Sequence, residues 1–422
     1  MINQVGIDRK IALAFVGSIV PEGAEFRNAA FSAAGQMYQA NLLSGLNRCG
    51  LERIEIFSCL PVPAFPSSKR LWVRGRRAEL NGLPLHLVSF INVLLLKQLM
   101  IGMAVCIRLM QWAWRNRAND RVILTYNLTV PPGLFTLLAA KSSRTKVLAA
   151  LCDVHVPGAV VPRNIFTIVD FWLHKRLTPY FHGFIVASDA MAKDFCAGRP
   201  AVRIEGGLSE QAIEYLRSHF RRAKARDGNF EIAVASKLDE VNGIPILLQA
   251  LERFPPHIHL YVAGAGPLAE EVRERASADD RLHFLGLLPF QQVLELYHSV
   301  DLLVNLRVTQ AIDTRYFFPS KFTEYVGSGT PVLSSRTGHI EAEYGEFVYL
   351  LENESAECLA AAIQEIARIP EPVRERRAEA GQTYVFREKT WDRQAAKAME
   401  LILQCLGKMQ DPTRPLPAGE SQ

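Results

Sequence analysis

The strongest constraint on the fold is a regular alternation of short apolar runs with longer amphipathic segments between residues 230 and 370. Short runs rich in Val, Leu and Ile predict buried strands, and the segments between them have the pattern of helices. We expect strands at 231–235, 259–263, 282–285, 301–306, 331–333 and 347–350, with helices at 243–253, 267–276, 290–298, 320–327 and 355–368. This alternation favours an α/β fold with a doubly wound parallel sheet.

The first half of the chain shows the same rhythm less regularly. Strands are expected at 10–17, 54–57, 121–126, 146–151 and 182–187, and a helix at 28–48. The polar segment 208–229 is expected to be the connection between domains. The pattern predicts two Rossmann-like domains over 1–208 and 209–388, a final helix over 389–408 and a disordered tail over 409–422.

The charge of the chain is divided unevenly between its halves. Residues 1–210 hold 24 Lys and Arg against 13 Asp and Glu, a net charge of +11, whereas residues 211–422 hold 24 against 30, a net charge of −6. So large a difference indicates that the first half meets an acidic lipid surface, an anionic acceptor or nucleic acid. Solvated surface charge is the alternative interpretation.

The cysteine pattern and the N-terminus suit a cytoplasmic protein. The seven cysteines are scattered, odd in number and without CxxC spacing, which is typical of reduced core residues. The apolar run at 10–17 is too short for a signal peptide.

One long apolar segment, 89–107, is interrupted by Asn92, Lys97 and Gln98. Placing Lys97 at the centre of a bilayer costs about 2.5 to 3.5 kcal/mol, so we exclude a membrane span. A helix from about 84 to 116 is expected. It either belongs to the core or lies on an anionic membrane, with aromatic and basic residues at headgroup level. These residues are Lys97, Arg108, Trp112, Trp114, Arg115 and Arg117.

The stretch 316–333 carries the most specific chemical signal. Pro319 suits the first turn of a helix, which would end at Gly327 or Gly329. A helix start at the carboxyl end of a parallel sheet offers free N–H groups to a phosphate. One turn later, Glu324 can accept hydrogen bonds from a diol. A phosphate together with a diol describes a sugar nucleotide.

With this motif, residues 230 to 350 resemble the donor-binding half of a GT-B glycosyltransferase of the retaining family-4 type, also called glycosyl transferases group 1. The resemblance implies two Rossmann-like domains facing each other across a cleft. That family carries two glutamates eight positions apart, for the donor sugar and the ribose. Glu324 matches the second, whereas the first falls on Tyr316, a departure from the family. Asp313 could replace it, although an ordinary turn residue is the alternative.

The resemblance extends to the loops that follow the other predicted strands. Lys237 stands where the family has an Arg directed to the diphosphate, and Asn242 stands where it has a Lys. It implies catalytic roles for Asp153, His155 and Lys237. It implies donor-binding roles for Gly17, Lys237, Asn242, Gly243, Gly264, Gly266, Leu287, Pro319, Ser320, Lys321 and Glu324.

The function implied is transfer of a sugar from a nucleotide diphosphate to a hydroxyl with retention of configuration, in bacterial polysaccharide or glycolipid synthesis. The expected partners are a nucleotide sugar, a glycan or lipid-linked acceptor and an anionic membrane at the inner face of the cytoplasmic membrane, with no nucleic acid. No cofactor or metal is expected, because the cationic loop can neutralise the diphosphate. The alternatives are a non-catalytic GT-B scaffold, which Tyr316 and Asn242 favour, and a nucleotide-sugar epimerase.

Overall fold

The computed structural model describes residues 10–21, 32–127, 132–154, 156–157, 164–219, 228–310 and 313–408. The chain divides into two compact units. The first comprises Met1–Pro157, Arg163–Ile204 and Gln394–Gln422, and the second comprises Gly158–Pro162 and Glu205–Arg393. The boundary at Ile204 and Glu205 lies close to the end of the first predicted domain.

Within its described residues, the first unit is built on an eight-stranded sheet of order β10-β9-β8-β7-β1-β2-β5-β4. Neighbouring strands are parallel except at the edge, where β4 and β5 are antiparallel. The strands are β1 (Ile11–Gly17), β2 (Arg53–Ser58), β4 (Arg77–Leu80), β5 (Leu83–Leu87), β7 (Asp120–Tyr126), β8 (Lys146–Leu151), β9 (Gly183–Val186) and β10 (Ala201–Arg203). The chain order reverses between β1 and β7, as in a doubly wound fold.

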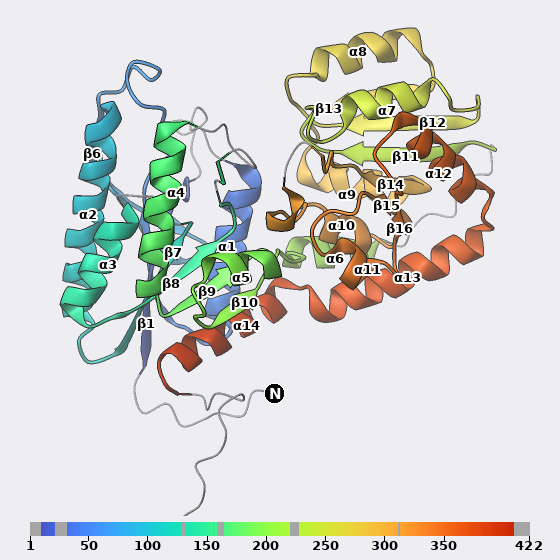
Figure 1. The fold of residues 1–422 in the computed structure, drawn as a ribbon. Helices are drawn as coiled ribbons and strands as arrows, with labels where there is room; N and C mark the ends of the chain where they lie inside the picture. The colour runs from blue at the N-terminus through green and yellow to red at the C-terminus, as the bar shows by residue number, and fades with distance from the viewer. Residues whose placement is uncertain are drawn as a thin grey trace, which may run out of the picture. The chain divides into compact units, whose positions relative to one another are not determined.

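The remaining elements of the first unit cover this sheet. A small antiparallel sheet pairs β3 (Trp72–Val73) with β6 (Phe90–Ile91). The helices are α1 (Ala33–Arg48), α2 (Leu94–Arg115), α3 (Pro132–Ser143), α4 (Ile165–Leu177), the 3-10 turn η2 (Thr178–Tyr180), α5 (Asp189–Phe195) and, from Gln394 onward, α14 (Trp391–Cys405). Figure 1 shows α2, α3 and α4 over one face of the sheet, and α2 packs against α3.

The structure corrects the predicted helix at 84–116. Residues 83–87 and 90–91 are strands, and α2 begins at Leu94. The reason is the period of two in Leu83, Leu85 and Leu87, all buried, which suits a strand. In the described part of the chain, no helix combines the length and apolarity that crossing a membrane requires.

The predicted headgroup residues of α2 do not share one environment. Trp112 is 1% exposed and belongs to the core, so its prediction as an interfacial residue is wrong. Lys97 is half-buried, donates to the carbonyl of Val62 and lies over the ring of Phe90. Trp114, in contrast, is 68% exposed.

The second unit is built on a fully parallel sheet of order β13-β12-β11-β14-β15-β16 in its described residues. The strands are β11 (Phe230–Ala235), β12 (Ile258–Ala263), β13 (Leu282–Gly286), β14 (Leu302–Asn305), β15 (Val332–Ser334) and β16 (Tyr349–Leu350). Chain order runs outward from β11 on one side and from β14 on the other. The sheet therefore has a topological switch point between β11 and β14, where ligands bind in such folds.

The helices of the second unit pack on both faces of this sheet. They are α6 (Glu210–Ser218), α7 (Ile244–Leu251), α8 (Ala269–Ala278), α9 (Phe290–Ser299), the 3-10 turn η3 (Thr314–Tyr316), α10 (Phe322–Gly327), α11 (Ile340–Tyr344), α12 (Ala356–Arg368) and α13 (Glu371–Glu388). The segment expected to be a linker contains α6, whose Ala212 and Leu216 are buried in the core. Part of that prediction is therefore wrong.

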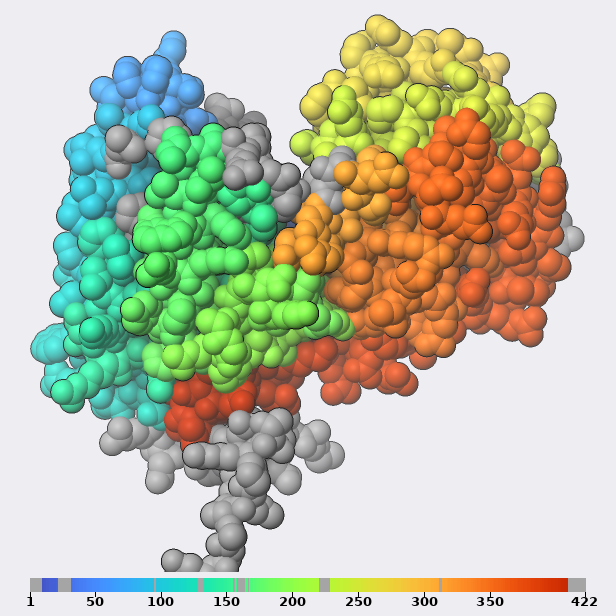
Figure 2. Space-filling model, in the orientation of Figure 1, coloured from blue at the N-terminus to red at the C-terminus, as the bar shows by residue number. Residues whose placement is uncertain are grey.

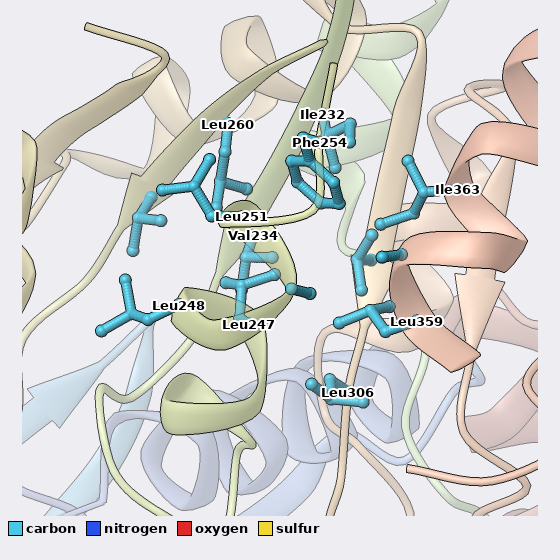
Figure 3. Close-up of a cluster of buried hydrophobic side chains, with 14 of the residues drawn as sticks. Ile232, Val234, Leu247, Leu248, Leu251, Phe254, Leu260, Leu306, Leu359 and Ile363 are labelled. Atoms are coloured by element: carbon cyan, nitrogen blue, oxygen red, sulfur yellow. The ribbon is translucent and has the colours of Figure 1, made fainter. Parts of the chain in front are cut away.

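A buried cluster between β11, β12, α7 and α12 holds one face of this unit together (Figure 3). Leu247 and Leu251 of α7 and Leu359 and Ile363 of α12 are at most 1% exposed. Each such side chain contributes about 1.5 to 3 kcal/mol relative to full exposure. This packing fixes β11 and α7, and with them the loop that joins the two elements.

Candidate functional site

The candidate site lies at the carboxyl edge of the second unit's sheet, beside the switch point. Lys237 follows β11, and its ammonium lies 3.0 Å from Oδ2 of Asp239. Burial alone would raise the pKa of Asp239, but hydrogen bonds from Lys237 and Asn242 lower it below its ordinary value. The Lys237 side chain is still 68% exposed. It can therefore swing toward an anion without first being freed from the core.

Asn242 organises this loop from within. It is buried, and its backbone N–H and side-chain amide both donate to Oδ1 of Asp239, at 3.0 and 2.5 Å. Gly243 follows with a positive φ of 67° and caps α7. A Cβ at Gly243 would lie 2.5 Å from the Leu306 side chain, so glycine satisfies both the backbone and the packing. Asn242 and Gly243, both predicted to bind the donor, therefore also stabilise the conformation of this loop.

Two glycines bring the loops after β11 and β12 into contact. A Cβ on Gly264 would lie 1.9 Å from the carbonyl oxygen of Ser236, and one on Gly266 would lie 2.3 Å from that of Leu238. Backbone hydrogen bonds join Leu238 to Ala265 and Gly264 to Gly286, so three consecutive strand ends are tied together. Leu287, in the third loop, is 79% exposed. Gly264 and Gly266 are therefore required for the close packing of the two loops, whether or not they bind a ligand.

A cation that the sequence analysis did not select lies on the other side of the switch point. Arg307 follows β14 and is half-buried. Burial lowers its pKa, and the negative charge of Asp239 partly offsets this effect. Val308 donates to the carbonyl of Val241 at 3.0 Å, which holds the two loops together. The signal that could have identified Arg307 was its position directly after a predicted strand.

The motif at 316–333 folds nearly as predicted, with one correction. The helix α10 begins at Phe322 and not in the turn that contains Pro319, Ser320 and Lys321. The carbonyl of Pro319 accepts from the amide of Phe322, so these three residues form the turn that precedes the helix. Ser320 is exposed and Pro319 is buried.

Glu324 and Lys321 lie three residues apart at the start of α10, and each affects the pKa of the other. Burial raises the pKa of Glu324 to about 7, although Lys321 opposes this shift. Burial lowers the pKa of Lys321, and Glu324 opposes that shift. The next residue, Tyr325, fixes the helix, because its hydroxyl contacts both the N–H and the C=O of Ala235 at the end of β11, at 2.7 and 3.1 Å. The end of β11, two residues before Lys237, therefore fixes the position of α10 and with it that of Glu324.

The position of the missing family glutamate is filled by a core side chain. Tyr316 is 7% exposed and lies in η3. Asp313 caps this turn through the amide of Arg315 and forms an ion pair with the Arg315 guanidinium at 2.7 Å. This geometry supports the interpretation of Asp313 as a turn residue.

In the first unit, the predicted residues lie at the carboxyl edge of its own sheet. Asp153 is exposed, and Nδ2 of Asn127 lies 3.3 Å from its Oδ2. The side-chain oxygen Oδ1 of Asn127 accepts from the backbone amides of Cys152 and Asp153. Asn127 was not selected from the sequence. His155 lies outside the described residues.

Gly17 ends β1 and has a packing reason to be glycine. A Cβ there would lie 2.3 Å from Oε1 of Gln39, a buried side chain on α1. The same oxygen accepts from the amide of Ser18 at 3.0 Å.

Among the described residues, Glu205, His339 and Glu343 lie close enough together to hold a metal ion. However, the ammonium of Lys389 is 2.5 Å from carboxylate oxygens of both glutamates. A side-chain cation already occupies the position between these carboxylates. The group is therefore better described as an ion-pair network than as a metal site, and the expectation that the reaction needs no metal stays a prediction.

Two units, each built on a parallel or mostly parallel doubly wound sheet, define the class of fold called GT-B, which solved glycosyltransferase structures share. Residues 229–368 match the family model of glycosyl transferases group 1. Residues 229–368 of the second unit are thus similar to a group 1 glycosyltransferase domain, and the resemblance seen in the sequence is confirmed.

Individual relatives agree with this class. One subunit of human phosphatidylinositol N-acetylglucosaminyltransferase is 28% identical over 145 residues, which is 33% of this chain and 29% of that protein. The match thus spans less than a third of the relative. Sucrose-phosphate synthase from Thermosynechococcus elongatus aligns with a TM-score of 0.65 at 14% identity, covering 94% of this chain and 100% of that one. Anabaena HepE in complex with UDP-glucose aligns with a TM-score of 0.60 at 17% identity, covering 92% and 99%. These structures share the fold.

Proposed function

We propose that the protein transfers a sugar from a nucleotide-diphosphate-sugar donor to a hydroxyl acceptor, with retention of anomeric configuration. The observation that carries the proposal is the set of groups at the switch point of a group 1 domain. Lys237, Arg307 and Lys321 supply positive charge from two neighbouring loops and the turn before α10, and Glu324 supplies a carboxylate. The complex of HepE with UDP-glucose supports a nucleotide sugar as the donor class.

In this proposal, the cations act on the leaving group. As the bond between the anomeric carbon and the diphosphate oxygen breaks, negative charge grows on the diphosphate. Lys237 and Arg307 stabilise that charge, and the stabilisation is strongest in the transition state. The acceptor oxygen attacks from the face that the diphosphate leaves, and its proton passes to the departing phosphate oxygen. Glu324 holds the ribose diol.

The acceptor is proposed to be a glycan or a lipid-linked sugar of bacterial polysaccharide or glycolipid synthesis, with Asp153 and His155 on the acceptor side. We further propose that the basic first unit brings the protein to the inner face of an anionic membrane. The net charge of +11 over residues 1–210 supports this contact.

A second candidate function is donor binding without transfer. Tyr316 is buried and the Asn242 amide is bonded to Asp239, so both positions where the family carries polar donor ligands are otherwise occupied. A scaffold protein would keep donor binding and lose turnover.

Two measurements test these functions. A thermal-shift panel of nucleotide sugars identifies the donor, because a ligand at 100 times its Kd adds about 2.7 kcal/mol. Donor hydrolysis without acceptor, followed by NMR, then separates the functions. Release of sugar with its original anomer supports a retaining transferase, a changed sugar on the nucleotide supports an epimerase, and binding without release supports a scaffold.

Lys237→Ala sharpens the test. If Lys237 stabilises the leaving diphosphate, the variant lowers kcat by more than it raises KM for the donor. Arg253→Ala is the control, since Arg253 is an exposed arginine of the same unit that pairs with Glu357. Loss confined to KM would make Lys237 a uniform binder of the donor.

A further inference from the structure

A groove lies between α3, the start of β8 and the last residue of α4 in the first unit, away from the candidate site. It has a volume of about 670 Å³, and Leu134, Leu138 and Leu177 are among the apolar side chains that line it. Leu134 and Leu138 are exposed, although both are large and apolar. An apolar groove of this size is suited to an extended hydrocarbon chain.

One end of the groove is cationic. Lys141, Arg144 and Lys146 line it, whereas none of its lining residues is Asp or Glu. Among the described residues, the ion pairs include none made by these three side chains. The dipole of α3 accounts for one cation in its last turn, Lys141, but not for Arg144 and Lys146 beyond it. The groove therefore combines an apolar wall with three uncompensated positive charges.

The outer face of α4 also exposes apolar side chains. Ile165, Val169 and Trp172 recur at the spacing of one helix face, and their exposed fractions are 65%, 45% and 54%. The guanidinium of Arg176 lies 4.8 Å from the centre of the Trp172 ring. Figure 2 shows this side of the first unit facing the viewer, with α3 and α4 at its surface. Tryptophan beside arginine is typical of the headgroup layer of a membrane.

We propose that this face docks on an anionic membrane and that the groove between α3 and α4 binds one anionic phospholipid. The lipid phosphate lies on Lys141, Arg144 and Lys146, and an acyl chain lies against Leu134, Leu138 and Leu177. The proposal rests on the membrane contact proposed above and assigns that contact to α3 and α4 in place of the face of α2 expected from the sequence.

The positive charge of the groove favours an anionic phospholipid over a second copy of the chain as the partner of this face. A symmetric dimer through this face would set one cationic groove against another, and like charges across an interface are unfavourable. A phospholipid supplies both the negative charge and the apolar chain that the groove lacks.

The test is flotation of the full chain with phosphatidylcholine vesicles, with and without phosphatidylglycerol, at low salt. Lys141→Ala/Arg144→Ala should weaken binding to the anionic vesicles about 25-fold, because each basic residue near such a surface contributes about fivefold. Lys69→Ala/Arg77→Ala is the matched control, since it removes one exposed Lys and one exposed Arg elsewhere in the same unit. Equal loss in both double variants would overturn the assignment, as would unchanged binding of the groove variant.

A second variant tests the apolar part. Leu138→Asp should weaken vesicle binding relative to the wild-type chain. The loss should persist at high salt, because salt does not screen the contribution from buried apolar area. Light scattering excludes the alternative occupant. If the wild-type chain is a dimer that Leu138→Asp dissociates, the face is an interface between copies and the proposal is wrong.

Donor binding is measured on the same variants, so that failure of the lipid-site proposal can be distinguished from failure of the proposed glycosyltransferase function. Both groove variants should keep the thermal shift with the donor, because the groove includes neither Gly17 nor any of the predicted donor-binding residues of the second unit. Vesicle binding without any nucleotide-sugar binding would reject the proposed function and leave the lipid site standing.

Discussion

Glu324 illustrates what a residue's surroundings add to its place in a motif. The spacing of the motif identified this residue from the sequence. Its ionisation, however, depends on burial, which raises the pKa to about 7, and on the opposing charge of Lys321. The charge of Lys321 is visible in the sequence, three residues earlier, but burial has no local sequence signature, since it results from the packing of α10 against the end of β11.

We expect the affinity for an intact nucleotide sugar to rise with pH and to level off above about pH 7. The carboxylate accepts hydrogen bonds from the ribose diol, so binding favours the ionised form, and below the pKa each donor that binds must displace a proton. The loss is at most tenfold per pH unit. Calorimetry between about pH 6 and pH 8 measures this dependence.

Glu324→Gln should weaken donor binding by about 1.5 to 3 kcal/mol at pH 8 and remove the pH dependence. The fold should not suffer. A carboxyl whose pKa is raised in the folded state opposes stability as pH rises above its ordinary pKa, and glutamine removes that cost. Glu357→Gln, at an exposed position on α12, is the control. A pH dependence that survives in Glu324→Gln would assign the titration to another group.

Arg307 is a residue whose role could not be predicted from the sequence. The strand before it was predicted, but no motif distinguishes its side chain from any other arginine in a loop. Only the fold shows that it is half-buried and close to Asp239. Tyr316 was identified correctly as a departure, yet its burial in the core followed only from the structure.

At the scale of elements, the alternation of apolar runs predicted the strands of the second unit well, because strands buried on both faces leave a clear pattern. The errors arose where two signals competed. Residues 210–218 were assigned to a linker on their charge, although Ser209 is an N-cap and the apolar face of α6 packs into the core. The start of α10 was placed at Pro319, which instead accepts the hydrogen bond that closes the preceding turn.

The contact between the loops after β11 and β12 depends on Gly264. Gly264→Ala should destabilise the second unit by more than the 1 to 3 kcal/mol that a strained backbone alone costs, because its Cβ would also collide with the carbonyl of Ser236. Since that carbonyl precedes Lys237, donor affinity should fall as well. Urea unfolding and donor calorimetry measure the two effects.

Gly286→Ala is the matched control for Gly264→Ala. Gly286 also has a positive φ, 64°, but a Cβ there meets no heavy atom within 4 Å. This variant should therefore lose only about 1 to 2 kcal/mol from its left-handed backbone. If the two alanine variants were equally stable, the close approach of Gly264 to Ser236 would have no energetic consequence.

At the scale of the whole molecule, the sequence predicted two Rossmann-like domains because each sheet leaves its own local pattern. Contacts between distant segments leave no such pattern. Glu205 begins the long segment of the second unit and Lys389 lies near its end at Arg393. These two residues form an ion pair across 184 positions of sequence. Backbone hydrogen bonds from Leu208 to Lys389 and from Trp391 to Leu208 join the same two segments.

This network holds its charges in a buried environment. Burial alone would raise the pKa of Glu205, but His339 and Lys389 hold it well below its ordinary value. The hydroxyl of Tyr344 donates to Glu205 at 3.0 Å, and the hydroxyl of Tyr384 donates to Glu343 at 2.6 Å. Glu205 therefore stabilises the folded chain at neutral pH, and this contribution is lost as the pH falls below the ordinary range of a glutamate.

Lys389→Met should destabilise the second unit by about 3 to 5 kcal/mol at pH 7, because it leaves the buried carboxylate of Glu205 and the half-buried carboxylate of Glu343 without their cation. The penalty should shrink on acidification. Without Lys389 the pKa of Glu205 rises, so protonation favours the folded variant, whereas the same change in pH weakens the wild type. Hydrogen exchange of peptides from the second unit measures this without assuming that both units unfold together.

The double variant Glu205→Gln/Lys389→Met identifies the cause of that loss. Replacing both partners removes the buried charge as well as its cation, so the double variant should be more stable than Lys389→Met alone. Glu343 stays charged beside Tyr384 and limits the recovery. If the double variant were less stable than either single variant, packing of the long side chains around Tyr344 would hold these segments together, and the ion pair would be secondary to it.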